Sequence, residues 1–456
     1  MATEQLPPED LIGRIDLDAM KVPMRHGIIR TVMAAIPDMR GHLKGKRLGS
    51  LALLERLGDT GGNRVAEACA YILATNANMD PLTGFDLTGW DDGYRDMGVD
   101  ADWPTLRVLP YMSGLALVHC DAVDLDGTPI EVAPRQILRR QLERLAGLGY
   151  QVKIGLESEF VLYHGPEPAV GRNIDYDFDL PPQIATFLGH LEAVLPDAGV
   201  DVEALKPEGA PGQFEATFPY TSATPMEACD NYTVYRHALR HVAQQHGLTA
   251  SFMAAPETGV GSGLHLHLSL WREGQPAFAI TSHRDMPPDP MAHGIAGLVD
   301  AMPRLAPLYL PTTNSYKRFA TPRSFAPQFM NWGPDNRGCA IRVTGHGDDA
   351  HLEVRLGGAD ANPYLLTAAA LASISHGLDR KLALPSPRLG DAYADRSALP
   401  LPPDLADALR DFQTSTLAHE LFGTEIVVHY SRAAQSELDE QRRTVTDVER
   451  SRFTLA

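Results

Sequence analysis

Three short apolar stretches of this chain carry charged or metal-binding side chains at alternate positions. Residues 154–162 contain two glutamates, residues 263–270 contain two histidines, and residues 351–356 contain a glutamate and an arginine. In a β-strand, residues i and i+2 point to the same face, so each stretch predicts a polar face opposite a face of Leu, Val and Phe. Burying a charge is costly unless the charge is paired or bound to a metal. Three such strands therefore predict a sheet whose polar face is a cation-containing active site.

The composition argues against several classes of protein. The chain of 456 residues has a formal net charge of -18, whereas non-specific binding of DNA or RNA needs a basic surface. The four cysteines form no CxxC pair, so we expect neither a zinc knuckle nor a thioredoxin-like site. The acidic N-terminus lacks an apolar core, and no apolar run reaches the length of a bilayer span. We therefore expect a cytoplasmic protein with no nucleic-acid or membrane partner.

The order of elements predicts an α+β protein with a domain boundary near residue 130. The elements predicted before this boundary are a helix within residues 1–25, a hairpin over 27–36 and 41–47, a helix over 48–57, and strands over 106–121. Residues 75–105 show no clear period and are expected to be irregular. We assign residues 1–130 to the first domain and residues 131–456 to the second.

The second domain is expected to alternate strands and helices. Pro134 precedes a helix over residues 135–148, and an Ala- and Leu-rich segment over 364–376 predicts a buried helix. The proline-rich residues 385–403 predict a loop or flap, and residues 405–452 predict two or three amphipathic helices.

The acidic and imidazole groups of this domain suggest a divalent cation and phosphate chemistry. The candidate metal ligands are Glu157, Glu159, Glu208, Glu215, His265 and Glu353. Oxygen-rich sets with an occasional imidazole suit Mg²⁺ or Mn²⁺. Arginines that can neutralise phosphate oxygens follow in the second half of the chain, at Arg318, Arg337, Arg342 and Arg355. No GxxxxGK[ST] or strand–GxGxxG–helix unit occurs, so a nucleotide site would be neither a P-loop nor a Rossmann fold.

These motifs, in this order, resemble the glutamine synthetase family along almost the whole chain. The matching segments are residues 45–47, 157–160, 208–215, 261–269, 314–318, 336–342 and 353–364. The resemblance implies a β-grasp N-terminal domain and a catalytic domain with a curved antiparallel sheet. It also implies a homo-oligomer of two stacked hexameric rings, with active sites between subunits.

The resemblance further implies two metal ions, ATP as a co-substrate and L-glutamate as a substrate. The ligands of the metal nearer glutamate match Glu159, Glu208 and Glu215. The ligands of the metal nearer the ATP phosphates match Glu157, His265 and Glu353. The ATP contacts match His267 and Ser269, the phosphate-binding arginines match Arg337 and Arg342, and the glutamate-binding positions match Gly261, Arg318 and Arg355.

The chain departs from the family pattern where ammonium would bind. The family's flap glutamate corresponds here to Ser324 or Phe325, so the carboxylate is missing. The family's N-terminal aspartate, which reaches a neighbour's ammonium site, has Asp92 or Asp96 as its counterpart, and one of these is the candidate proton acceptor. The family's adenylylation motif is not recognisable around Tyr393.

The chain keeps the family motifs for the ligation reaction, but its ammonium pocket is altered. In this combination it resembles the γ-glutamyl-amine ligase branch of the family. Replacing a glutamate with a small or apolar residue removes a charge and frees volume for the carbon chain of an amine. We therefore expect glutamate to be joined to a small primary amine such as ethanolamine. The alternatives are a polyamine, ammonium as in ordinary glutamine synthetase, and an inactive structural or regulatory homologue.

Overall fold

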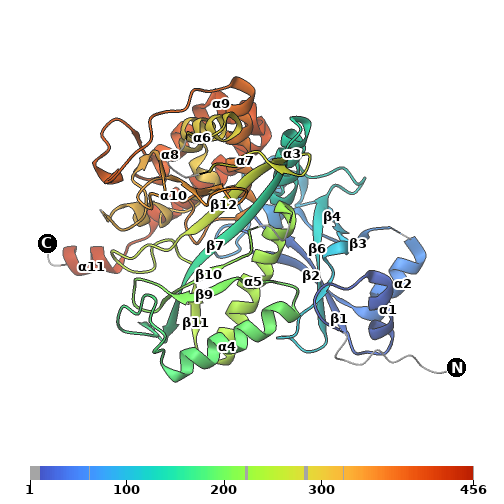
Figure 1. The fold of residues 1–456 in the computed structure, drawn as a ribbon. Helices are drawn as coiled ribbons and strands as arrows, with labels where there is room; N and C mark the ends of the chain where they lie inside the picture. Colours follow the sequence, from blue (N-terminus) through green and yellow to red (C-terminus); the bar gives the residue numbers. More distant parts are fainter. Residues whose placement is uncertain (1–10, 61, 221–223, 282–285, 322, 455–456) are drawn as a thin grey trace.

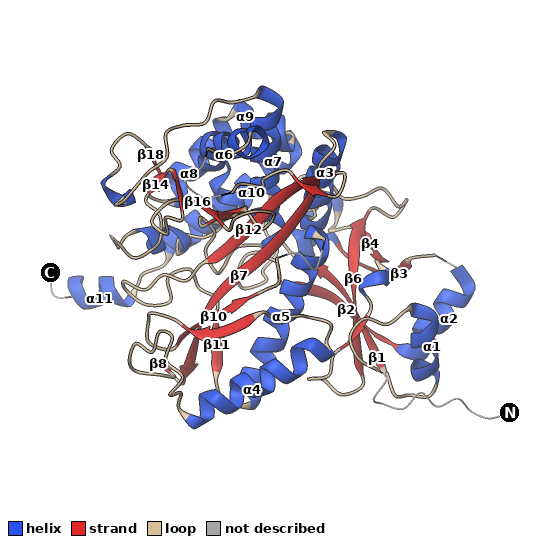
Figure 2. Ribbon diagram, viewed as in Figure 1, coloured by secondary structure: helices blue, strands red, loops and turns tan. Residues whose placement is uncertain are grey.

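The computed structural model describes residues 11–454 apart from residues 61, 221–223, 282–285 and 322. It contains two main β-sheets with helices packed around them, and the N-terminal residues form the smaller sheet (Figure 1). The expected α+β class is confirmed (Figure 2). No helix in the described part of the chain is long and apolar enough to cross a membrane.

The smaller sheet has six strands in the order β2-β1-β6-β4-β3, with β5 paired to β6. Its strands are β1 (Thr31–Pro37), β2 (Leu43–Gly49), β3 (Arg64–Cys69), β4 (Asp96–Ala101), β5 (Arg107–Val108) and β6 (Leu115–Val123). Strands β1 and β6 are parallel, and the other pairs are antiparallel. Both parallel strands are mostly buried, which explains their mainly apolar sequences. Helices α1 (Leu17–Arg25) and α2 (Ser50–Thr60) complete this part of the chain.

Two strands of this sheet differ from the sequence analysis. Strand β4 lies within residues 75–105, which were expected to be irregular, and β3 was not predicted. Asp and Gly residues weaken the strand signal of β4. In the fold, Asp100 of β4 faces Arg64 of β3 and forms an ion pair with it, while Met97 and Val99 are buried. The cross-strand pair is not visible from the sequence of either strand alone.

The larger sheet has ten strands, and its main order is β15-β16-β17-β12-β7-β10-β9. Its strands are β7 (Gln151–His164), β8 (Glu167–Pro168), β9 (Ala204–Pro207), β10 (Gln213–Thr217), β11 (Thr249–Ser251), β12 (Leu264–Arg272), β13 (Gln275–Pro276), β15 (Trp332–Pro334), β16 (Ile341–Thr344) and β17 (His351–Val354). All of its pairs are antiparallel except β15–β16. A separate two-stranded ribbon joins β14 (Phe329–Met330) to β18 (Leu399–Pro400).

The helices that follow residue 130 pack against this sheet or on one another (Figure 1). They are α3 (Pro134–Gly147), α4 (Pro182–Asp197), α5 (Pro225–Gln245), α6 (Asp289–Ala301), α7 (Pro363–Arg380), α8 (Leu405–Thr414), α9 (Thr416–Phe422), α10 (Thr424–Arg443) and α11 (Asp447–Phe453). The prediction of two or three helices at the C-terminal end was wrong, because α8–α11 are four. Ser415 and Gly423 separate the first three helices by single residues. Interruptions of one residue barely change the helical spacing of the apolar residues, so the sequence does not show where one helix ends and the next begins.

Polar groups buried between the two sheets fix their relative position. The Arg135 guanidinium, 2% exposed, pairs with Asp230 of α5 at 3.0 Å and with Asp121 of β6 at 2.6 Å. The side chain of Asn362, which caps α7, donates to the carbonyls of Asp38 and Met39 in the β1–β2 turn. Removing one partner of a buried ion pair costs about 3–5 kcal/mol, so loss of Arg135 would strongly destabilise the contact between α5 and β6.

Candidate active site

The register of the larger sheet brings the alternating polar positions onto one face. Glu157 of β7 lies opposite His265 of β12, and Glu353 of β17 lies opposite His267. Glu215 of β10 extends the row, because it pairs with Glu159. The intervening leucines of β12, at positions 264, 266, 268 and 270, are fully buried on the opposite face. The alternation seen in the sequence is therefore used by the fold.

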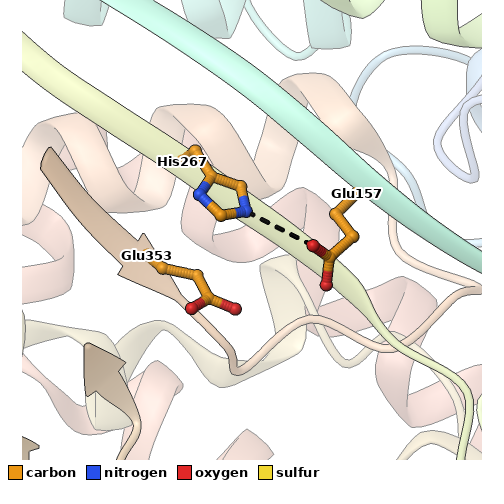
Figure 3. Close-up of side chains that lie close together, drawn as sticks. All are labelled: Glu157, His267 and Glu353. Atoms are coloured by element: carbon orange, nitrogen blue, oxygen red, sulfur yellow. Dashed lines mark ion pairs between the residues drawn. The ribbon is translucent and has the colours of Figure 1, made fainter. Parts of the chain in front are cut away.

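Two histidines are surrounded by carboxylates at the centre of this face. Nδ1 of His265 lies 2.6 Å from Glu157 Oε1 and 3.5 Å from Glu353 Oε1, and its Nε2 lies 3.8 Å from Glu159 Oε1. The side chains of Glu157, His267 and Glu353 point toward one another (Figure 3), and one ligand atom from each lies within 4.8 Å of the others. This trio includes His267, which the sequence analysis assigned to ATP, in place of His265.

The remaining carboxylates form a second group next to Lys206. The Lys206 ammonium contacts the Glu208 carboxylate and lies 3.7 Å from both Glu215 Oε1 and Asp175 Oδ1. Burial and the nearby Glu157 carboxylate raise the pKa of Glu215 to about 9. The cluster therefore holds more carboxylate than its cations neutralise. A donor set of this kind fits divalent cations that prefer oxygen and imidazole ligands.

The arginines lie beside these carboxylates. Arg355 contacts Glu353, and Arg342 Nη1 donates to Glu353 at 2.9 Å. Burial raises the pKa of Glu353, but the Arg355 guanidinium and the two histidines outweigh it and lower this pKa to about 2. The Nε atom of Arg355 is buried without a hydrogen-bond partner, as is Nε2 of His267. Unpartnered polar atoms at this depth fit a site that takes a polar ligand.

Arg318 lies beneath the cavity and shapes it. Its guanidinium donates to the carbonyls of Arg355 and Leu356 at 3.2 and 3.4 Å and lies 3.3 Å from His265 Nε2. A Cβ atom on Gly261 would come 2.9 Å from Arg318 Cγ, so the absence of a side chain at Gly261 lets the arginine stem pass. Arg318 is 4% exposed, and it supports the floor of the site from behind.

Two residues that line the site, Gln213 and Lys206, were not among the predicted site residues. The Gln213 amide donates to Glu159 Oε2 at 3.0 Å and to the Gly261 carbonyl at 2.9 Å, and the Gly263 N–H also donates to Glu159. Gln213 therefore orients Glu159. The i, i+2 rule applied to β10 pairs Gln213 with Glu215, so a usable signal was present.

These groups line one cavity of about 810 Å³. The predicted site residues that line it are Glu157, Glu159, Glu208, Glu215, Gly261, His265, Ser324, Arg337, Arg342, Glu353 and Arg355. Lys206, Asp175 and the exposed Phe325 line it as well. Phe325 has a φ of 60°, an uncommon conformation for a bulky residue, and it follows Ser324, whose buried Oγ lacks a hydrogen-bond partner.

Four predicted site residues other than Arg318 do not line this cavity. The Asp92 carboxylate accepts hydrogen bonds from the backbone N–H groups of Gly89 and Tyr94, and Asp96 is an exposed residue at the start of β4. Ser269 accepts a hydrogen bond from the Trp271 indole at 2.8 Å. His267 adjoins the cavity through Glu157. Within one chain the fold does not bring Asp92 or Asp96 to the candidate active site.

Comparisons with known proteins agree with this geometry. Residues 131–453 match the family model described as glutamine synthetase, catalytic domain. A γ-glutamylethanolamide synthetase of Streptomyces coelicolor is 39% identical over 98% of this chain and 97% of its own length. A glutamate–isopropylamine ligase of a Pseudomonas species is 31% identical over 93% of this chain and 95% of its own length.

Solved structures show the same fold. A ligand-free GmaS structure superposes with a TM-score of 0.82 at 24% identity, covering 96% of this chain and 99% of that one. A structure described as a novel glutamine synthase homolog gives a TM-score of 0.79 at 26% identity, with coverages of 92% and 96%. The expected fold is therefore confirmed, and the chain belongs to the glutamine synthetase family.

Proposed function

We propose that this chain is an ATP-dependent ligase that joins the γ-carboxylate of L-glutamate to a small primary amine such as ethanolamine. The observation that carries the proposal is the single cavity in which the carboxylates, His265 and three arginines meet beside Ser324. The resemblance assigns the position of the flap glutamate to Ser324 or Phe325, and in either case a carboxylate for ammonium is missing there. One relative is named for an ethanolamide product and another for the ligation of isopropylamine, and both names support an amine in preference to ammonium.

We assign two Mg²⁺ or Mn²⁺ ions to the cavity. Glu159, Glu208 and Glu215 would hold the ion nearer glutamate, and Glu157, His265 and Glu353 would hold the ion nearer ATP. His267 is an additional candidate for the second ion, because it belongs to the trio in Figure 3. When bound, such ions neutralise phosphate oxygens and polarise the phosphoryl group.

Each substrate has a proposed set of protein contacts. Arg355, which lines the cavity, is assigned to the glutamate carboxylate, with Gly261 keeping the cavity floor open. Arg318 was also expected to bind glutamate, but it lies behind this floor and supports it. ATP is assigned to His267, Ser269 and the phosphate-binding Arg342. Arg337 is assigned to the transferring phosphoryl group, because guanidinium groups stabilise the charge that develops there.

The proposed reaction has two steps. An oxygen of the γ-carboxylate attacks the γ-phosphorus of ATP, the bond to ADP breaks, and γ-glutamyl phosphate forms. The amine nitrogen then attacks the acyl carbon, phosphate leaves with the bonding electrons, and the nitrogen loses a proton. An alkylammonium pKa resembles that of Lys, about 10.4, so supplying the free amine at pH 7 costs roughly 4–5 kcal/mol. A carboxylate that accepts this proton is therefore needed, and Asp92 or Asp96 of a neighbouring subunit is the candidate.

The assembly is part of the proposal. We propose two stacked hexameric rings, in which residues 1–130 of one subunit close the cavity formed by residues 131–456 of the next. In the described part of one chain, neither Asp92 nor Asp96 lines the cavity, which is expected if a neighbouring subunit supplies them. The four cysteines are free, which fits the reducing cytoplasm in which we expect the protein.

A diamine is the second candidate for the amine substrate. Asp175 lines the cavity within 3.7 Å of the Lys206 ammonium, so a carboxylate is available for the distal ammonium of a diamine. A γ-glutamylputrescine synthetase of Escherichia coli is 32% identical over 91% of this chain. Asp175→Asn should weaken a diamine more than ethanolamine.

Phosphate release distinguishes these functions. The protein is assayed with ATP, Mg²⁺, L-glutamate and one of ammonium, ethanolamine, methylamine, putrescine or spermidine, and mass spectrometry identifies the product. We expect the highest kcat/KM with ethanolamine. Turnover confined to ammonium would identify an ordinary glutamine synthetase, and no turnover with any amine would favour the inactive homologue.

A further inference from the structure

A second cavity lies between the β1–β2 hairpin and helix α5, outside the candidate active site. Its volume is about 320 Å³, within the range of roughly 300–1,000 Å³ typical of small-molecule sites. The hairpin contributes His42 and Lys44. Helix α5 contributes residues spaced three and four apart on one face, which include Arg236, His237, Arg240 and His241.

The positive groups of this cavity have no anionic partner among the described residues. Arg236 is 4% exposed, yet its Nε and Nη1 atoms have no hydrogen-bond partner, and its Nη2 lies 3.4 Å from His42 Nε2. Its guanidinium and that of Arg240 lie over the Phe252 ring, at 4.8 and 5.2 Å from the ring centroid. Among the described residues, no carboxylate forms an ion pair with Arg236, Arg240 or Lys44. A buried arginine is rarely found without an anion.

Two buried carboxylates act electrostatically on these arginines, Asp38 on Arg240 and Asp360 on Arg236, but neither forms an ion pair with them, and burial raises the pKa of Asp360. Asp38 is 3% exposed, and its Oδ1 accepts hydrogen bonds from the backbone N–H groups of Arg40 and His42 at 2.9 Å. Burial raises the pKa of Asp38, which weakens it as a counterion. Burial, together with Arg236 and Arg240, lowers the pKa of His42 to about 2, so this imidazole is neutral. Uncompensated arginines therefore collect at one cavity of a chain whose net charge is -18.

We propose that this cavity binds a small multivalent anion, a phosphate compound or a dicarboxylate, held by Arg236, Arg240 and Lys44. Planar guanidinium forks donate paired hydrogen bonds to phosphate or carboxylate oxygens, and the stacking on Phe252 holds both forks in place. An anion in the cavity would supply the partners that Arg236 Nε and Nη1 lack.

Calorimetry of the full-length protein tests the proposal. Inorganic phosphate and glutarate are titrated separately at constant ionic strength set by chloride. We expect at least one of them to bind with a Kd below about 1 mM. Arg240→Gln should weaken that binding at least tenfold, and Arg240→Lys should weaken it less. The control is Arg410→Gln, which removes the same charge from an exposed position of α8 and should leave binding unchanged.

The two anions and the variants separate the outcomes. Preference for phosphate identifies a phosphate compound, and preference for glutarate identifies a dicarboxylate. Phosphate held at the candidate active site would be unaffected by Arg240→Gln. If Arg240→Gln lowers the thermal midpoint of the ligand-free protein strongly, Lys44→Gln provides the same test without altering α5. Absence of binding by both anions, or binding that neither variant weakens, overturns the proposal. The proposal is also overturned if Arg240→Gln dissociates the oligomer and neither anion binds the unsubstituted protein. In that case a second copy of the chain would fill the cavity.

Discussion

Glu353→Gln separates the two roles that Glu353 could have, a metal ligand and a counterion for arginines. The side chain is 1% exposed, contacts Arg355, and accepts from Arg342 at 2.9 Å. The substitution keeps the size of the side chain and removes its charge. The buried Arg355 guanidinium then loses the carboxylate that it contacts, whereas Arg342 keeps its ion pair with Asp335, and a bound cation loses one oxygen ligand.

Two estimates of the stability effect agree. The environment holds the pKa of Glu353 at about 2 instead of 4.5, which corresponds to roughly 3 kcal/mol at about 1.4 kcal/mol per pK unit. Breaking a buried ion pair by removing one partner costs about 3–5 kcal/mol. We therefore expect the free energy of unfolding of the metal-free protein to fall by about 3 kcal/mol. The Kd for Mn²⁺ should rise at least tenfold, because losing even an outer-shell partner costs about 10–100-fold.

Urea denaturation and electron paramagnetic resonance of Mn²⁺ measure the two effects. The matched control is Glu420→Gln, which breaks an exposed pair with Arg380 at 2.9 Å and should cost at most about 1 kcal/mol without changing Mn²⁺ binding. If Glu353→Gln lowers stability while Mn²⁺ binds as before, Glu353 serves only as a counterion. If stability does not change, the argument from buried pairing is wrong.

Four further predictions concern specificity, metal binding, pH and assembly. Ser324→Glu should raise the ratio of kcat/KM for ammonium over ethanolamine at least tenfold in the phosphate-release assay, and an unchanged ratio would contradict the role given to this position. Lys206→Met removes an ammonium that competes for two carboxylates, so Mn²⁺ should bind more tightly in calorimetric titrations; weaker binding would show that the lysine supports the site. Burial lowers the pKa of His119 to about 3 from 6.5, so the unfolded chain binds more protons. The contribution of His119 should thus lower the free energy of unfolding by about 2 kcal/mol between pH 7 and pH 5. In urea denaturation, His119→Asn should lose about this much less stability over the same pH range. Mixing inactive Asp92→Asn and Glu353→Gln subunits should restore activity if sites lie between chains, and no recovery would argue against that arrangement.

The polar face of the larger sheet could be predicted because its signal is local. Alternation of leucine with glutamate or histidine defines a strand and its two faces without knowledge of the neighbours. The same sequence does not say which residues face each other across strands. The pairing of His265 with Glu157 and of His267 with Glu353 depends on the register of three strands that are distant in the chain. The close approach of Glu157, His267 and Glu353 in Figure 3 could therefore not be predicted from any one strand, and the resemblance assigned His265 in the place of His267.

Residues that act through long-range contacts were harder to find. Lys206 has no unusual local pattern, and its contact with Glu208 and Glu215 depends on the turn between β9 and β10. Likewise, Arg236, whose Nε and Nη1 atoms have no hydrogen-bond partner, looks in the sequence like an ordinary polar residue of a helix. Its significance arises from the hairpin and Phe252 that bury it.

The carboxylates that one chain supplies to the cavity are poorly suited to accept a proton from the amine. Glu353 is paired with arginines and has a pKa of about 2, and Glu159 is held by Gln213 and the Gly263 N–H. Glu215, whose pKa is raised by burial and the Glu157 carboxylate, is assigned to a metal ion and is not free to accept the proton. A group from a second chain is thus the better candidate. The backbone N–H of Gly89 lowers the pKa of Asp92, so Asp92 is a weak base, and its larger effect would be electrostatic stabilisation of the positive charge on the attacking nitrogen.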